Sequence, residues 1–333
     1  MPETDISPIL VTGAAGFIGH AVSIRLVERG ETVIGIDNLN DYYDPALKAA
    51  RLANLKALDG FRFIEMDVSD ADGVRDLVQA NGVQRIIHLA AQAGVRYSIE
   101  NPFAYQKSNL QGHLSLLEAS RHADNFQHLV YASSSSVYGD KPMGGEGFTE
   151  EEPATDPVSL YAATKRSGEL MSQSYAKLYG FPMTGLRFFT VYGPWGRPDM
   201  AYFGFTQKIL AGEAIEVYGE GKMARDFTYI DDIVDGILGA LDHAPARHEH
   251  RILNIGDSRP VGLMDMITAL EDALGMEAKK IMRPMQPGDV TATYADVTKL
   301  HALTGYEPGV MLEDGLKLFV SWYRDFYGNL PPE

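Results

Sequence analysis

The sequence predicts an α/β fold with a doubly wound parallel sheet, followed by a smaller, interleaved α/β portion toward the C-terminus. Short apolar runs alternate with longer amphipathic segments through the first half of the chain, and this alternation is typical of strand–helix–strand units in a parallel sheet. A glycine-rich loop joins the first expected strand to the first expected helix. After residue 189 the regular alternation gives way to aromatic residues and turn formers.

The composition excludes several classes of protein. The 333 residues contain no cysteine, so disulfides and thiolate metal sites are absent, and the net charge of −16 argues against a nucleic-acid partner. No apolar run reaches the roughly 18 residues of a membrane span, and the acidic N-terminus does not resemble a signal peptide. We expect a cytoplasmic protein without a membrane partner. For His243, His248 and His250 we expect a solvated loop and no metal.

The first unit of the chain is a strand at 8–12, a G-x-x-G-x-x-G loop, a helix and a second strand at 32–36 that ends at Asp37. Glycines in such a loop let backbone N–H groups and a helix N-terminus approach a pyrophosphate. An acid about 20 residues further on binds the adenosine ribose and repels a 2′-phosphate, which favours NAD over NADP. The expected cofactor contacts here are Gly13, Gly16, Phe17, Ile18, Gly19, Asp37 and Asn38.

The alternation then continues and predicts the rest of a Rossmann sheet. We expect strands at 61–65, 85–89 and 128–132, and helices near 70–80 and 99–122. Ligands of such sheets bind at the carboxyl ends of the strands. The expected cofactor contacts at these ends, and on the second helix, are Asp67, Val68, Leu89, Ala90, Ala91 and Asn109.

Tyr161 and Lys165 lie four residues apart in a segment expected to be helical to about residue 179, with a strand following at 183–187. Residues at i and i+4 share one face of a helix. Free tyrosine has a pKa of about 10, and a neighbouring positive charge favours the phenolate. A row of four serines, 133–136, follows the fifth strand, where hydroxyls can bind a substrate. Tyr161 is therefore a candidate base.

The second half of the chain is less regular. We expect helices near 200–211, 263–274, 296–304 and 313–327, strands at 215–218 and 251–255, a segment 225–232 that opens another helix, and a turn at 286–289. We divide the chain into a cofactor-binding domain, 1–189, which carries the serine row, Tyr161 and Lys165, and a mainly substrate-binding portion, 190–333. The second portion is expected to interleave with the sheet.

Together these motifs resemble the extended short-chain dehydrogenases/reductases, and within them the UDP-glucuronate 4-epimerases. The resemblance covers residues 8–325, and its most specific stretches are 36–44, 88–98 and 185–200. It implies NAD as a bound cofactor, a UDP-sugar substrate and a homodimer through a four-helix interface built from the helices near 99–122 and 158–179.

The resemblance also implies roles for individual residues. Ser134, Tyr161 and Lys165 would be catalytic, Tyr161 as the base and Lys165 as its modulator, and both would also contact the cofactor. The implied substrate contacts are Ser135, Ser136, Thr190, Arg197, Arg225 and Asp289. In UDP-glucose epimerases an arginine usually stands where this chain has Gln286, so the resemblance does not supply the full set of diphosphate contacts.

The implied reaction is reversible C4 epimerisation of UDP-glucuronate to UDP-galacturonate, by transient hydride transfer to NAD through a 4-keto intermediate and without decarboxylation. That intermediate is a β-keto acid, so the carboxylate must be held still. Arg197 suits a bidentate grip. An arginine left unpaired in a buried pocket would also penalise a neutral sugar, and such sites can reject analogues by about 10⁴–10⁵.

Three alternatives stay open. The first is a UDP-glucose/UDP-galactose 4-epimerase. The second is a UDP-glucuronate decarboxylase or a related 4,6-dehydratase, families that typically carry a glutamate immediately before the Val-Tyr-Gly of the serine loop, where this chain has Ser136. The third is a non-catalytic NAD-binding regulator, against which the intact set of Ser134, Tyr161 and Lys165 argues.

Overall fold

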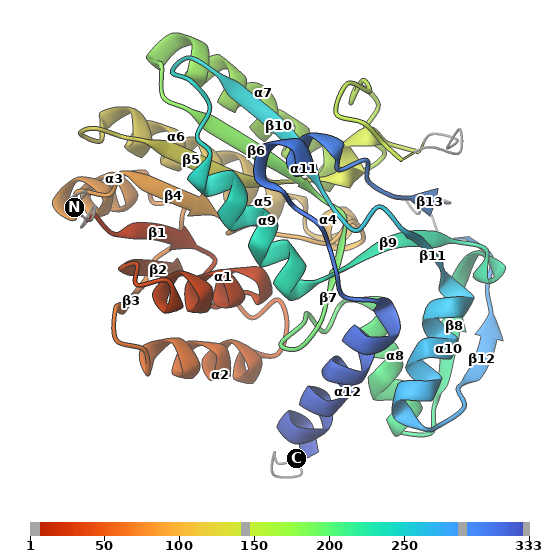
Figure 1. Cartoon of the computed structure of the whole chain (residues 1–333). Helices are drawn as coiled ribbons and strands as arrows, with labels where there is room; N and C mark the ends of the chain where they lie inside the picture. The colour runs from red at the N-terminus through yellow and green to blue at the C-terminus, as the bar shows by residue number, and fades with distance from the viewer. Residues whose placement is uncertain (1–6, 141–146, 286–291, 329–333) are drawn as a thin grey trace.

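A seven-stranded, fully parallel sheet forms the centre of the computed structural model, which describes residues 7–140, 147–285 and 292–328 (Figure 1). The strand order is β10-β6-β5-β4-β1-β2-β3. These strands are β1 (Ile9–Thr12), β2 (Val33–Asp37), β3 (Phe61–Glu65), β4 (Arg85–His88), β5 (His128–Ser134), β6 (Met183–Phe188) and β10 (His250–Ile255). The inner strands are almost wholly buried, as their apolar sequences require for a sheet covered on both faces.

Helices cover both faces of this sheet, which confirms the predicted doubly wound α/β fold (Figure 1). Helices α1 (Phe17–Glu28) and α9 (Ile230–Asp242) pack together on one face. On the other face α6 (Gly112–His122) packs between α3 (Ala71–Ala80) and α7 (Leu160–Tyr179). No helix in the described part of the chain is both long and apolar enough to cross a membrane.

The strand order reverses between β1 and β4, which are neighbours although they are not consecutive in the sequence. Thr12 at the end of β1 lies beside His88 at the end of β4 and beside Ile36 of β2. At such a switch point the connections leave in opposite directions and open a crevice at the carboxyl ends of the strands. The fold therefore places a ligand site next to the glycine-rich loop.

The helix predicted near 99–122 is continuous only from Pro102 to His122, and part of it is π-helical. The chain forms the short helices α4 (Tyr97–Glu100) and α5 (Pro102–Tyr105), a π-helical segment η1 (Gln106–Gln111), and then α6. Pro102 stands at the first position of α5, and Asn101 caps this helix by accepting a hydrogen bond from the Ala104 N–H. Because proline and an N-cap begin helices rather than continue them, they separate α4 from α5.

Two further elements differ from the sequence-based expectation. Helix α2 (Pro45–Lys56) lies between β2 and β3, where no helix was predicted. The segment 225–232 leads into a helix as expected, since α9 begins at Ile230, but residues 225–229 belong to strand β9 (Ala224–Tyr229), which was not predicted. The last four residues of β9 are all buried, and Asp231 and Asp232 occupy the first turn of α9.

The remaining residues form two smaller sheets beside the large one (Figure 1). Strand β9 pairs with β7 (Thr190–Tyr192), β11 (Pro260–Gly262) and β13 (Ala292–Thr293), and β8 (Ala214–Val217) pairs with β12 (Lys279–Met282). The accompanying helices are α8 (Ala201–Leu210), η3 (Tyr218–Gly221), α10 (Leu263–Leu274) and α12 (Leu312–Gly328). Strand β10 and α11 (Thr298–Thr304) return to the large sheet, so late parts of the chain contribute to it.

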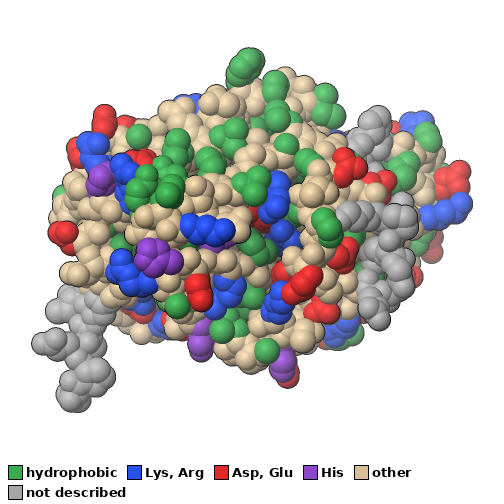
Figure 2. Space-filling view, turned by 90° about the horizontal axis from the view of Figure 1, so that it is seen from above, with side chains coloured by type: hydrophobic (Ala, Val, Ile, Leu, Met, Phe, Trp, Pro, Cys, Tyr) green, Lys and Arg blue, Asp and Glu red, His purple; other side chains and the backbone are tan. Residues whose placement is uncertain are grey.

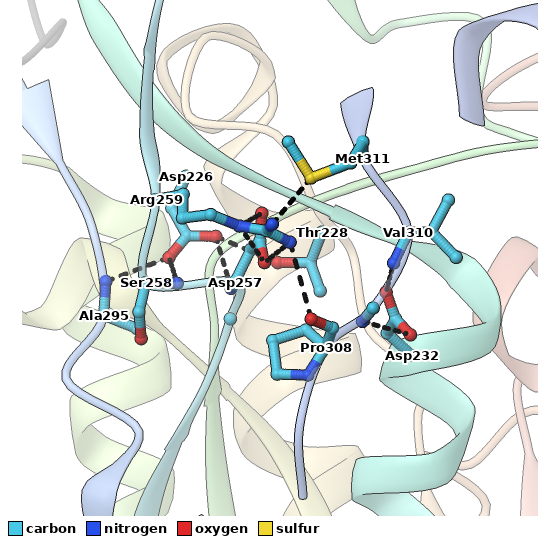
Figure 3. A network of polar contacts seen from close by, with 12 residues as sticks. Asp226, Thr228, Asp232, Asp257, Ser258, Arg259, Ala295, Pro308, Val310 and Met311 are labelled. Atoms are coloured by element: carbon cyan, nitrogen blue, oxygen red, sulfur yellow. Dashed lines mark hydrogen bonds and ion pairs between the residues drawn. The ribbon is translucent and has the colours of Figure 1, made fainter. Parts of the chain in front are cut away.

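A buried carboxylate ties these late segments together (Figure 3). Asp226 in β9 is fully buried and accepts hydrogen bonds from the Thr228 hydroxyl and from the backbone N–H groups of Asp257, Ser258 and Ala295. Burial raises the pKa of Asp226, although these donors favour its charged form. Asp226 thus fixes the loop after β10 and the segment after β13 against β9.

Candidate active site

A cavity of about 710 Å³ lies at the carboxyl ends of β1, β2, β4 and β5, at the switch point of the large sheet. Most residues that the sequence singles out line it. They are Gly13, Gly16, Phe17, Ile18, Gly19, Asp37, Asn38, Val68, Leu89, Ala90, Ala91, Ser134, Ser135, Ser136, Tyr161, Lys165, Thr190 and Arg197. The fold therefore brings the glycine-rich loop, the serine row, Tyr161 and Arg197 to one place from widely separated parts of the sequence.

The glycine-rich loop is packed too closely to accept side chains. Gly13 has a φ of +73°, and a Cβ built on it would stand 2.8 Å from the Ala90 nitrogen. A Cβ on Gly19 would stand 2.1 Å from the Gly13 carbonyl oxygen. The cap residue of α1, Gly16, offers no side-chain hydrogen bond to the first N–H groups of the helix, and residues 16–19 line the cavity. This arrangement fits a dinucleotide pyrophosphate.

Asp37 is fixed at the end of β2, where an adenosine ribose would lie. Its carboxylate accepts hydrogen bonds from the N–H groups of Ala15 and Leu39, at 3.2 and 2.9 Å. The Nζ atom of Lys48, which also lines the cavity, lies 4.0 Å from Asp37. Residues for the ribose end of NAD are thus present and oriented, and Lys48 is a neighbour that the sequence analysis did not identify.

Three of the predicted contacts, Asp67, Asn109 and Arg225, do not line the cavity. Asp67 is held by Lys107, Asn38 and Ser69 outside the cavity lining, and these hydrogen bonds outweigh burial and lower its pKa to about 2. Asn109 is buried, and its amide is engaged with Gln92 and Thr164. Arg225 donates a hydrogen bond to the Ala224 carbonyl and is also outside the lining. Asp289 lies outside the described residues.

Ser134, Tyr161 and Lys165 meet where β5 ends and α7 begins. Ser159 caps α7 by accepting a hydrogen bond from the Ala162 N–H, which fixes the turn that carries Tyr161. Tyr161 and Ser134 are hydrogen-bonded. Lys165 places its Nζ atom 6.0 Å from the centre of the Tyr161 ring and donates a 2.9 Å hydrogen bond to the Ala132 carbonyl. The helical spacing inferred from the sequence therefore yields one clustered site.

The electrostatics of Tyr161 differ from the sequence-based picture. Burial raises the pKa of Tyr161, while the hydrogen bond with Ser134 and the positive charge of Arg197 lower it without reversing the shift. Burial, with a smaller effect of Arg197, lowers the pKa of Lys165 to about 8. Arg197 is therefore a further cation that favours the phenolate, beside Lys165, to which the sequence analysis assigned this effect.

Arg197 already has a carboxylate partner inside the cavity. Its Nε atom donates to Oδ1 of Asp199 at 3.0 Å, and its Nη2 atom donates to Oδ2. Burial lowers the pKa of Arg197, but the charge and hydrogen bonds of Asp199 outweigh this and raise it above the ordinary value. The premise that Arg197 stands unpaired before substrate arrives is therefore wrong.

A fully buried arginine holds the loop that precedes Arg197. Arg51, on α2, donates hydrogen bonds to the carbonyls of Trp195 and Gly196 on this loop and to that of Ala15 in the glycine-rich loop. Trp195 has a φ of +62°, a conformation that non-glycine residues rarely adopt. Arg51 thus connects the cofactor loop to the loop that carries Arg197.

The histidine cluster has no metal-binding arrangement. His250 is not in a solvated loop as predicted: it lies on β10 and forms a 2.7 Å hydrogen bond with the Tyr131 hydroxyl, and burial lowers its pKa to about 4. His243 and His248 are exposed. Within the described ranges, no group of three or more His, Asp or Glu side chains is placed to hold a metal ion.

The chain is similar to known NAD-dependent epimerases. The model of the NAD dependent epimerase/dehydratase family matches residues 9–256. UDP-glucuronate 4-epimerase 5 of Arabidopsis thaliana is 49% identical over 96% of this chain and 76% of its own length. UDP-glucuronic acid 4-epimerase of Bacillus cereus, solved in complex with UDP-glucuronic acid and NAD, is 35% identical with a TM-score of 0.88, covering 96% of this chain and 100% of that one.

A third relative represents one of the alternatives. UDP-glucose 4-epimerase of Thermotoga maritima, solved with UDP-glucose, is 31% identical with a TM-score of 0.86 and covers 96% of this chain and 99% of that one. The resemblance and the cofactor class inferred from the sequence are confirmed. The chain belongs to the NAD dependent epimerase/dehydratase family, in which the UDP-glucuronate 4-epimerases are its relatives.

Proposed function

We propose that this chain interconverts UDP-glucuronate and UDP-galacturonate by C4 epimerisation, with NAD bound throughout the cycle. The observation that carries the proposal is that Arg197 and Thr190 line the same cavity as Ser134, Tyr161 and Lys165. A group that can grip a carboxylate therefore stands beside a group that can remove a hydroxyl proton. The relatives named UDP-glucuronate 4-epimerase support the same reading.

In this proposal Tyr161 removes the proton of the substrate 4-hydroxyl. General-base help of this kind contributes about 10²–10⁴-fold. NAD, when bound, supplies the acceptor that takes the C4 hydrogen with its electron pair and later returns it to the other face of the turned sugar. Ser134 orients the 4-hydroxyl through its hydrogen bond with Tyr161. Lys165 adds positive charge beside the ring.

Control of the carboxylate separates epimerisation from decarboxylation. A ketone at C4 makes the C5 carboxylate prone to leave as CO₂, and a bidentate hydrogen bond from Arg197 would hold that group away from the orientation that allows it. The position where decarboxylases typically carry a glutamate holds Ser136, whose hydroxyl donates a 2.9 Å hydrogen bond to Ser134. No proton-handling acid stands at this position.

The other ligand contacts are assigned by the division of the chain into a cofactor-binding and a substrate-binding portion. We propose that residues 1–189 hold NAD and the catalytic groups, and that residues 190–333 mainly hold the UDP-sugar, with Ser135 and Ser136 also facing the sugar. Because its amide is taken by Gln92 and Thr164, Asn109 would act by positioning the cofactor loop and α7. Diphosphate and ribose binding by Arg225 and Asp289, and an adenine contact by Asp67, stay predictions.

Product analysis tests the proposal against its alternatives. Purified protein is incubated separately with UDP-glucuronate and UDP-glucose at equal concentration, and products are separated by anion-exchange chromatography. We expect UDP-galacturonate from the first and a much slower reaction with the second. Preferred turnover of UDP-glucose would support the UDP-glucose 4-epimerase alternative, and a UDP-pentose would show a decarboxylase.

We also propose that two copies associate through α5 and α7, which pack against each other in one chain. Large apolar side chains are exposed on these elements and on α4, including Ile99 at 70%, Phe103 at 79% and Leu178 at 66%. Seen from above, the face of the molecule on which α7 lies uppermost in Figure 1 carries several groups of hydrophobic side chains (Figure 2). Isologous pairing would bury them.

Light scattering at micromolar concentration tests the association. A dimeric mass that becomes monomeric in Phe103→Asp is expected, and a monomeric mass of the parent protein would refute the proposed dimer.

The cytoplasmic location expected from the sequence stays a prediction.

A further inference from the structure

Asp199 is not explained by the proposed reaction. In that reaction Arg197 binds the substrate carboxylate, yet in the structure Arg197 is already hydrogen-bonded to the Asp199 carboxylate inside the same cavity. Asp199 contacts the Nε and Nη2 atoms, which form one edge of the guanidinium. Since arginine carries five N–H donors, the other edge, formed by Nη1 and the second hydrogen of Nη2, stays free of Asp199.

Asp199 is itself held in place from a distant part of the sequence. The Tyr42 hydroxyl donates a 3.3 Å hydrogen bond to its Oδ2 atom. The Tyr42 ring packs 4.8 Å from that of Tyr97. Gly94 leaves the room that this contact needs, because a Cβ there would stand 2.7 Å from the Tyr42 oxygen. The Asp199 carboxylate is therefore held by Arg197 and Tyr42, and the stretch that contains Gly94 and Tyr97 packs against Tyr42 in turn.

The charge of the Arg197–Asp199 pair affects how strongly the site prefers a uronate over a neutral sugar. With Asp199 in place, the pair has no net charge, so a substrate carboxylate meets a weaker attraction than it would from a lone guanidinium. A neutral sugar, in turn, does not leave Arg197 without a partner. The side chains of Arg197 and Asp199 are 25% and 27% exposed, so the pair is only partly screened by solvent.

We propose that Asp199 is a specificity-determining residue, the resident counter-ion that limits how strongly Arg197 prefers a uronate over a neutral sugar. This rests on the proposed function, in which Arg197 grips the uronate. The limit has a use in an epimerase. The substrate carboxylate must be released with the product, and a guanidinium without a counter-ion would hold it more tightly and slow that release.

Binding measurements in a variant that cannot turn over test the proposal. Tyr161→Phe, with its NAD, is titrated by calorimetry with UDP-glucuronate and with UDP-glucose, alone and combined with Asp199→Asn. Asp235→Asn is the matched control, because it removes the same charge from an exposed pair with Arg25. We expect Asp199→Asn to raise the ratio of UDP-glucuronate to UDP-glucose affinity by about tenfold, and the control to leave it unchanged.

The other outcomes are distinguishable. A lower ratio in Asp199→Asn would mean that Asp199 only orients Arg197, and an unchanged ratio would mean that it does neither; both overturn the proposal. Asp199→Ser, checked by thermal melting, should give the same increase if the amide variant folds poorly. If Tyr161→Phe itself binds no UDP-glucuronate, or if adding Arg197→Ala leaves that affinity intact, the proposed function fails first.

Discussion

Glu169 and Arg187 form a two-point ion pair behind the catalytic residues. The Nε and Nη2 atoms of Arg187, on β6, each donate to one Glu169 oxygen at 2.9 Å, and Glu169 lies one turn beyond Lys165 on α7. Glu169 also accepts a 2.6 Å hydrogen bond from Ser133 at the end of β5. The helix that carries Tyr161 and Lys165 is therefore tied to both strands that flank the site.

Removal of the Glu169 charge should destabilise the whole fold. The side chains of Glu169 and Arg187 are only 1% and 4% exposed, so Glu169→Gln leaves a buried guanidinium without its counter-charge. We expect a loss of roughly 3–5 kcal/mol in the free energy of unfolding, measured by urea denaturation. Asp314→Asn removes a charge from an exposed pair with Lys317 and should cost under about 1 kcal/mol. Equal losses in the two variants would contradict this.

Lys165 should support catalysis but lower the stability of the folded protein. Its pKa of about 8 lies below the ordinary value near 10.5, so the unfolded chain binds more protons than the native chain between these values. Stability then rises with pH across this window, and at pH 7 the protonated buried amine is destabilising. Lys165→Met should be more stable at pH 7 by about 1–3 kcal/mol while losing epimerase activity.

Thermal melting after removal of NAD tests this prediction for Lys165→Met. The difference between variant and parent should shrink as the pH approaches about 10.5, where the unfolded amine also loses its proton. A variant that melts below the parent at pH 7 would show that the hydrogen bond from Lys165 to the Ala132 carbonyl outweighs the cost of burying the charge.

Arg197→Ala should lose the control of the substrate carboxylate. We expect kcat/KM for UDP-glucuronate to fall by the equivalent of roughly 3–5 kcal/mol, and the share of UDP-pentose among the products to rise. Arg75→Ala removes an exposed arginine on α3 and serves as the control. Unchanged UDP-glucuronate kinetics in Arg197→Ala would remove Arg197 from the proposed site.

Arg51 should support both ligands through the two loops it joins. Its guanidinium is fully buried and uses donors on Nε, Nη1 and Nη2, a pattern that a lysine cannot reproduce. Arg51→Lys should therefore lower both the NAD content of the purified protein, measured by absorbance after extraction, and kcat/KM for UDP-glucuronate. A loss of stability with full NAD content and unchanged kcat/KM would show a purely structural role.

Features set by local spacing could be predicted from the sequence. The glycine-rich loop, Asp37 and the Tyr161–Lys165 pair depend on helix and strand geometry over a few residues, and all of them reached the cavity. The break after α4 was missed although Asn101 and Pro102 signal it, because the apolar pattern continues across it. Helix α2 was also missed, although Asp44 caps it ahead of Pro45.

Contacts between distant segments could not be predicted in this way. Arg51 binds carbonyl oxygens of Trp195 and Gly196, and a carbonyl acceptor leaves no trace in residue identity. Asp199 stands two residues from Arg197, but only the fold of that loop decides whether the two side chains meet. The burial that raises the pKa of Tyr161 likewise depends on the complete cavity wall.

In the proposed reaction the C4 hydrogen leaves the sugar and returns to it within one site. Proton NMR of the purified protein with UDP-glucuronate in D₂O, with no added cofactor, follows this hydrogen. We predict UDP-galacturonate at a steady ratio to substrate, with all carbons retained and no deuterium at C4. Deuterium at C4 would refute the return of the same hydrogen, and a UDP-pentose in place of UDP-galacturonate would show decarboxylation.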